Sequence, residues 1–222
     1  MADVPGMDLQ TRIPLSRHRA LSTAVALADV EGLGSLTMRR LARELGVEAM
    51  SLYHHVANKD EILDGMVELV FAEIEHPAQG VDWKPAMRER AGSVRAALRR
   101  HPWAISILQS RTSPGPENLG HLDALIGCFR TAGFSVVMAA HATSLVDSYV
   151  YGFVLQEVNL PGEESGGIEA VIDGVLPNLA RDFPYLAELT VEHVLAPGYR
   201  YADEFDFGIG LILDGLEAAA RR

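Results

Sequence analysis

The chain has 222 residues, of which 48% are hydrophobic and 22% charged, the composition of a soluble globular protein with a sizeable core. Its 30 acidic and 19 basic side chains give a net charge of -11. This balance alone disfavours nucleic acid, because binding to phosphates depends on Lys and Arg. The charge is uneven, however: residues 12–59 carry seven basic and four acidic side chains, whereas residues 60–222 carry 12 basic and 24 acidic ones. The average therefore does not exclude DNA binding by the first quarter of the chain.

Two further features bear on where the protein works. The single cysteine, Cys128, excludes an internal disulfide, and the first residues lack the basic and apolar regions of a secretory signal. The longest apolar stretch, residues 134–155, is interrupted by His141 and Asp147, so we expect no membrane span. The sequence predicts a cytoplasmic protein with no membrane partner.

The predicted elements are all helical. Residues 1–14 lack periodicity and are expected to form a flexible N-terminus. Ser16 is suited to cap a helix that ends between Asp29 and Glu31, before Gly32. Further helices are predicted over residues 37–45, 48–55, 58–75, 83–101, 103–109, 116–132, 135–159, 168–181 and 204–221, with a mobile Gly-rich loop over residues 162–167. No segment alternates with a period of two residues, so the sequence predicts an all-α fold.

The most informative segment, residues 36–59, reads LTMRRLARELGVEAMSLYHHVANK. Thr37 can cap a helix, and Gly46 supplies the left-handed conformation of a tight turn before a second, short helix. The positions expected to be buried are Leu41, Ala42, Leu45, Val47, Leu52 and Val56. This pattern is typical of a helix-turn-helix, which places its second helix in the major groove of DNA.

The residues expected to be exposed on this motif have the chemistry of DNA contacts. Arg39 can reach a phosphate or a guanine, and Lys59 supplies a compact cation. Ser51 and Tyr53 offer hydroxyls and His55 a ring N–H, while Ala49 and Met50 can contact thymine methyl groups. A structural helix pair in a helical enzyme or bundle would show the same spacing, so the spacing alone leaves that alternative open.

Residues 16–75 resemble the DNA-binding domain of the tetracycline-repressor (TetR) family of regulators. The resemblance lies in the Thr that opens the second helix, the Leu-Ala pair, the Leu-Gly-Val turn, the Leu-Tyr-x-His core and the Asn-Lys pair. It continues more weakly through DWKPAMRERAGSVRAALRRHPW. It implies an all-α homodimer, with an N-terminal three-helix helix-turn-helix domain over residues 15–76. A larger helical ligand-binding and dimerisation domain would span residues 77–222.

The resemblance also implies which residues meet the DNA and what the ligand is not. The operator contacts fall on Thr37, Arg39, Ala49, Met50, Ser51, Tyr53, His55 and Lys59. Ala49 and Met50 replace a polar residue and a proline of tetracycline repressors, so the operator sequence should differ. Two histidines that hold tetracycline and its magnesium correspond to Glu75 and Leu108. We therefore expect a different, mostly hydrophobic or aromatic inducer, with no metal and no cofactor.

Two groups of residues are expected to carry the ligand and the dimer contacts. A cavity that is apolar with a few polar groups would be lined by Arg90, Trp103, Ile107, Leu108, Phe129, Met138, His141, Tyr149, Phe153 and Gln156. Small residues that allow close helix packing predict an interface at Ala140, Ser144, Ser148, Gly152, Phe205, Gly208, Ile212 and Gly215. The alternative is that both stripes face the core of a single chain.

No motif of metal, phosphate-loop or nucleophilic chemistry stands in the sequence, so no catalytic residue is predicted. We predict a ligand-responsive transcriptional regulator, a repressor, that binds a palindromic double-stranded DNA operator as a homodimer and is released by a small-molecule inducer. The alternative is a helical small-molecule-binding or interaction protein without DNA-binding activity.

Overall fold

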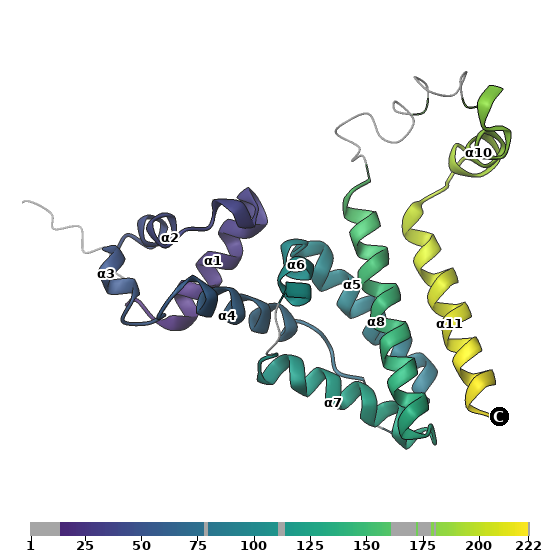
Figure 1. The fold of residues 1–222 in the computed structure, drawn as a ribbon, viewed down its shortest axis with the longest axis horizontal. Helices are drawn as coiled ribbons and strands as arrows, with labels where there is room; N and C mark the ends of the chain where they lie inside the picture. The colour runs from purple at the N-terminus through teal and green to yellow at the C-terminus, as the bar shows by residue number, and fades with distance from the viewer. Residues whose placement is uncertain are drawn as a thin grey trace, which may run out of the picture. The chain divides into compact units, whose positions relative to one another are not determined.

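The computed structural model describes residues 14–77, 80–110, 114–160, 172, 179 and 181–221 (Figure 1). Among these residues all regular structure is helical and no strand is present, which confirms the predicted all-α fold. The chain forms two compact units, Met1–Leu69 and Val70–Arg222. The division falls inside α4 (Lys59–Phe71), whereas the domains predicted from the sequence meet at residues 76 and 77.

The first unit is built from helices whose ends are fixed by local hydrogen bonds. Helix α1 (Arg17–Glu31) begins where Ser16 Oγ accepts from the Arg19 N–H at 3.2 Å. A 3₁₀ turn, η1 (Leu33–Ser35), leads to α2 (Met38–Leu45), where Thr37 Oγ1 accepts from the Arg40 N–H at 3.1 Å. Gly46 ends α2 with a φ of 69°, the left-handed conformation that glycine adopts without strain. Helix α3 (Ala49–Leu52) follows this turn.

Helix α4 (Lys59–Phe71) starts with a reciprocal cap. Asn58 Oδ1 accepts from the Glu61 N–H at 2.8 Å, and the Glu61 carboxylate accepts from the Ala57 N–H at 2.7 Å. The predicted end at residue 75 was wrong, because the helix stops at Phe71 and the chain leaves through tight turns. There the Glu75 N–H donates to Ser93 Oγ at 2.9 Å, so this segment is held by α5 and not by a further helical turn.

The second unit has α8 (Val136–Val158) at its centre. Helix α8 packs against α5 (Trp83–Arg100), α7 (Pro116–Thr131) and α11 (Glu204–Ala220), while α6 (Trp103–Ser110) packs against α5 (Figure 1). One face of α8 is buried along its length, from Ala139 to Val154, and faces these neighbours.

Three short elements near the C-terminus were not predicted. They are α10 (Pro184–Leu189), which runs into the π-helical turn η3 (Thr190–Val194), and the 3₁₀ turn η4 (Tyr201–Asp203). Elements of three to six residues are too short for a helical period to show in the sequence. The predicted N-terminus 1–14 (except Pro14), the loop 162–167 and most of the helix 168–181 lie outside the described residues.

Candidate DNA-binding face and ligand site

The helix-turn-helix core lies where the sequence predicts it. Leu41, Ala42 and Leu45 of α2 are buried, as are Leu52 of α3 and Val56 after it. Val47 is only half-buried, although it was predicted to be in the core. Its N–H donates to the Ala42 carbonyl at 3.0 Å, which fixes the turn between the two helices.

The predicted DNA contacts lie mostly on the surface of the first unit. Met50 is 73% exposed and Tyr53 44% exposed, unusual values for large apolar and aromatic side chains. Arg39, Ser51 and Lys59 are also exposed. Three members of the predicted set differ: Ala49 and His55 are half-buried, and the exposed Thr37 already uses its hydroxyl oxygen as the cap of α2. The unit therefore presents two cations, two hydroxyls and an apolar side chain on and around α3.

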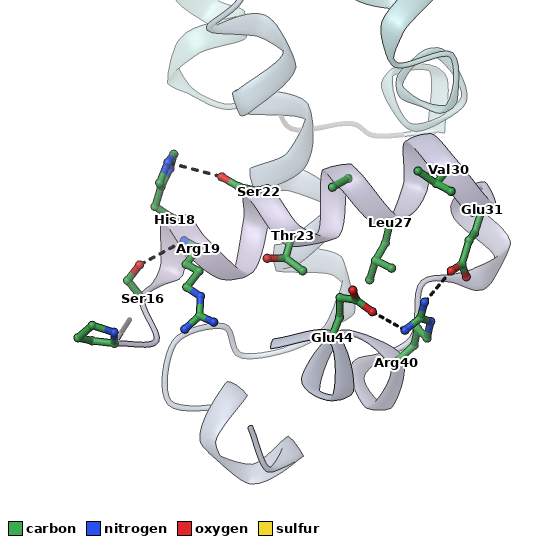
Figure 2. Close-up of a pocket in the computed structure, with 12 residues that line it drawn as sticks. Ser16, His18, Arg19, Ser22, Thr23, Leu27, Val30, Glu31, Arg40 and Glu44 are labelled. Carbon is green, nitrogen blue, oxygen red and sulfur yellow. Dashed lines mark hydrogen bonds and ion pairs between the residues drawn. The ribbon is translucent and has the colours of Figure 1, made fainter. Parts of the chain in front are cut away.

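The cations of this unit fall into two groups. Figure 2 shows Arg40 held between two carboxylates, Glu31 of α1 and Glu44 of α2, each at 2.6 Å. These bonds raise the pKa of Arg40 and lower the pKa of Glu31, and they tie α1 to α2 beside a surface groove of about 750 Å³. By contrast, within the described part of the chain no ion pair engages Arg39 or Lys59. Those two cations are available to phosphates.

The ten predicted ligand residues are not brought to one place. Trp103 and Ile107 are buried on α6, where Leu108 is half-buried. Phe129 packs against Trp83 and Phe134, with ring centroids 5.7 and 5.2 Å apart. Arg90 is buried on α5 and forms an ion pair with Asp147 of α8.

Three other predicted ligand residues belong to the packing of α8 against α11. The Tyr149 hydroxyl donates to the backbone carbonyls of Glu204 and Phe205, both at 3.1 Å. Gln156 Oε1 accepts from the Tyr201 hydroxyl at 2.8 Å, and the Phe153 ring meets the Phe205 ring edge-on at 5.1 Å. The hydroxyl of Tyr149 and the carbonyl oxygen of Gln156 are therefore already bonded inside the chain.

The last two predicted ligand residues, Met138 and His141, line a shallow apolar groove of about 430 Å³ between α8 and α11. The predicted ligand residues are scattered because successive side chains of a helix are rotated by about 100° around its axis. Residues chosen along α8 for their chemistry alone therefore point to different neighbouring helices.

Sequence reasoning missed four polar residues, of which His121 of α7 and Thr143 of α8 are buried and Asp147 and Tyr151 of α8 are half-buried. The last three recur every four residues, a spacing that places them on one side of α8. Polar residues with this spacing in an otherwise apolar helix were the available signal.

The predicted dimer residues divide in a similar way. Ala140, Ser144 and Ser148 of α8 and Gly215 of α11 are exposed, while Gly152, Gly208 and Ile212 are half-buried. Phe205 is a correction: it is 2% exposed in the single chain, because it packs against Tyr149 and Phe153 and under the Arg95 guanidinium. The same face also exposes three large apolar side chains, Leu145, Phe207 and Leu211.

The fold and the exposed helix-turn-helix face define a regulator of the helix-turn-helix class, and comparison with known families makes this specific. Residues 20–66 match the bacterial regulatory proteins of the tetR family, and residues 76–220 match the tetracyclin repressor-like C-terminal domain. The chain belongs to the TetR family of transcriptional regulators. Members of this family bind DNA and small-molecule ligands, often as dimers.

Individual relatives agree with this assignment. The chain is 34% identical to the HTH-type transcriptional repressor DrrR1 of Streptomyces coeruleorubidus, over 91% of this chain and 77% of that repressor. It is 31% identical to the class E tetracycline repressor protein of Escherichia coli, over 92% of each chain. Among solved structures, ActR of Streptomyces coelicolor in complex with actinorhodin superposes with a TM-score of 0.77 and 29% identity, over 95% of this chain and 100% of ActR. These relatives support a ligand-responsive regulator.

The described residues offer neither a metal site nor a helix that could span a membrane. No group of three or more His, Cys, Asp or Glu side chains there is arranged to hold a metal ion. The helices in that part of the chain are each too short or too polar to cross a membrane.

Proposed function

We propose that this chain is a repressor that binds a palindromic DNA operator as a homodimer and that a small, mostly hydrophobic or aromatic inducer, bound in the C-terminal unit, releases it. The observation that carries the proposal is the exposed face around α3. Arg39 of α2 and Lys59 at the start of α4 are exposed and engage no ion pair among the described residues, and Met50 and Tyr53 are exposed as well. Arg40, by contrast, is already neutralised by two carboxylates.

The proposed DNA contacts are the residues predicted from the sequence, but they do not all play the same role. Arg39, Ser51, Tyr53 and Lys59 are suited to phosphates, and Met50 to a thymine methyl group. Thr37, Ala49 and His55 would contribute through the backbone or at the edge of the face. The Thr37 hydroxyl already caps α2, and the side chains of Ala49 and His55 are half-buried.

The experiment that tests this proposal is selection of operators from a random double-stranded DNA library by the full-length protein, followed by fluorescence anisotropy. We expect enrichment of a palindrome whose half-sites are about 34 Å apart, one turn of DNA. Tyr53→Ala should weaken binding to it, while Tyr185→Ala, an exposed tyrosine of the other unit, should not. If no sequence is enriched, the alternative of a helical small-molecule-binding protein without DNA-binding activity is the better one.

The dimer is proposed to form through α8 and α11. Both helices present an uncharged face that includes Ser144, Ser148, Leu145 and Leu211, and an apolar surface of this kind is typical of an interface. Ser148→Glu should give monomers in sedimentation velocity, and Ser148→Ala, which adds no charge, should remain dimeric. Gly208 is a poor site for this test, because any side chain there would collide with Tyr149 of the same chain.

A further inference from the structure

A group of buried and half-buried polar side chains lies where α5, α7 and α8 of the second unit pack together. We call it the buried polar cluster: Arg90 of α5, His121 of α7, and Thr143, Asp147 and Tyr151 of α8. Arg90 is 3% exposed, His121 1% and Thr143 9%. Burial of polar groups costs free energy unless they are hydrogen-bonded, so such a cluster needs a reason.

Arg90 is only partly neutralised. One guanidinium nitrogen, Nη1, donates to Asp147 Oδ1 at 3.2 Å, and the Nε–H has no acceptor among the residues that the structure describes. A guanidinium and a carboxylate that serve only each other usually form two parallel bonds. Burial also raises the pKa of Asp147, even though Arg90 opposes this, so the carboxylate is an imperfect counter-charge. The cation therefore keeps an open donor in a dry environment.

His121 and Thr143 add two more open atoms. The His121 ring stacks on His76 with centroids 4.0 Å apart, and it also bonds to the backbone of Phe71. Burial lowers its pKa, and among the described residues Nδ1 has no partner. Thr143 Oγ1 likewise has no partner within that part of the chain. Buried polar atoms in folded proteins usually have a hydrogen-bond partner, and these three come from three helices that pack on one another, which points to a shared partner from outside the chain.

The surroundings of these atoms are apolar. Met87 and Val94 lie one helical turn from Arg90 on α5, Leu125 lies one turn from His121 on α7, and Val150 lies beside Tyr151 on α8; all four are buried. A groove of about 600 Å³ runs between the start of α5 and α7, and the His76 ring that stacks on His121 forms part of its wall. The three helices that carry these residues, α5, α7 and α8, pack on one another, as their ribbons in Figure 1 show.

We propose that the buried polar cluster receives the polar end of the inducer and that this end carries an anionic oxygen, that of an aromatic carboxylic acid. The carboxylate would accept from Arg90 Nε and from the Thr143 hydroxyl, and a hydroxyl of the ligand would donate to His121 Nδ1. The apolar side chains one turn away suit an aromatic body. This inference rests on the proposed function, since it names the chemistry of the ligand that the regulator senses.

Calorimetric titration of the full-length protein, without DNA, tests the proposal. The probes are 2-naphthoate, 3-hydroxy-2-naphthoate and 9-anthracenecarboxylate, each beside its own methyl ester. At least one acid should bind, and roughly 10- to 100-fold more tightly than its ester, because its anionic oxygen meets a buried guanidinium. Equal affinity of acid and ester, or no binding by any of the three acids, would overturn the proposal.

Variants of the cluster separate recognition from stability. Thr143→Val should weaken binding of the acid and leave the ester unchanged, while Thr190→Val, a buried threonine whose hydroxyl is bonded to the Leu186 carbonyl, should change neither. Asp147→Asn should tighten binding of the acid, because it removes the carboxylate that competes for Arg90. A purely structural cluster would instead give weaker or unchanged binding in Asp147→Asn, and that result would refute the inference.

The outcome is separable from that of the proposed function. A protein that selects acids but enriches no operator keeps this inference and loses the regulatory proposal. A protein that enriches an operator but does not distinguish acids from esters does the reverse.

Discussion

Helix α11 approaches α8 closely at Gly208, so we predict that Gly208→Ala destabilises the fold by an amount that can be worked out from the structure. A Cβ atom at residue 208 would lie 2.2 Å from the Tyr149 hydroxyl oxygen and 2.6 Å from its ring carbon Cζ. These distances are below contact, so in Gly208→Ala the tyrosine must move. It would then leave the carbonyls of Glu204 and Phe205, to which its hydroxyl donates.

The expected cost combines three contributions. Overpacking of a filled core costs about 1–3 kcal/mol, and loss of the hydroxyl's hydrogen bond about 0.5–1.5 kcal/mol. Replacing glycine by alanine inside a helix returns about 1 kcal/mol. The net loss is roughly 0.5–3.5 kcal/mol, which for a unit of this size lowers Tm by about 1–14 °C.

Differential scanning calorimetry at one fixed protein concentration measures this shift. The matched control is Gly92→Ala in α5, where a Cβ meets no atom within 4 Å and should leave Tm unchanged or higher. In a Tyr149→Leu background the clash is gone, so Gly208→Ala should no longer lower Tm. A Gly208→Ala protein that melts at or above the wild-type temperature would refute the reasoning.

Three further predictions concern charge. Lys59→Ala should weaken DNA binding to all sequences and flatten its salt dependence, measured by anisotropy at several salt concentrations; an unchanged slope would contradict a phosphate contact. Glu157→Ala should cost about 3–5 kcal/mol in chemical denaturation, because it strands the largely buried Arg95, whereas Asp182→Ala, which breaks an exposed pair, should cost less than about 1 kcal/mol. Burial raises the pKa of Asp147, so in the folded state this carboxyl keeps its proton at pH values above its ordinary pKa of 3.8. Its ionisation at still higher pH then lowers the free energy of unfolding. Wild type should therefore lose stability relative to Asp147→Asn as pH rises from 3.8 through the raised pKa; a constant difference would contradict this.

The helix starts were predictable because their causes are local. Ser16, Thr37 and Asn58 each accept a hydrogen bond from an N–H three residues later, and such contacts can be read from neighbouring letters. The end of α4 was not predictable in this way. It depends on Ser93 and Arg100 of α5, which bind the backbone of Glu75 and the carboxylate of Glu73.

The proposed ligand site shows the same limit more strongly. The polar cluster requires the pairing of Arg90 with Asp147, 57 residues later, and no local pattern indicates which face of α8 meets α5. The aromatic residues Tyr149 and Phe153 were chosen for their chemistry, but their place on α8 directs them to α11. The DNA-binding face was more accessible to sequence reasoning, since its exposed residues alternate with core positions inside one short motif.

The clamp of Arg40 between Glu31 and Glu44 affects how salt titrations of this protein should be interpreted. A cation already neutralised by two carboxylates of its own chain displaces few counterions from DNA. The same holds for Arg17, which is paired with Glu61. The slope of affinity against salt should therefore report fewer phosphates than the seven basic side chains of this region suggest. Glu31→Gln would leave Arg40 paired with Glu44 alone, so that its charge is neutralised by one carboxylate instead of two. This should steepen the slope and weaken the tie between α1 and α2.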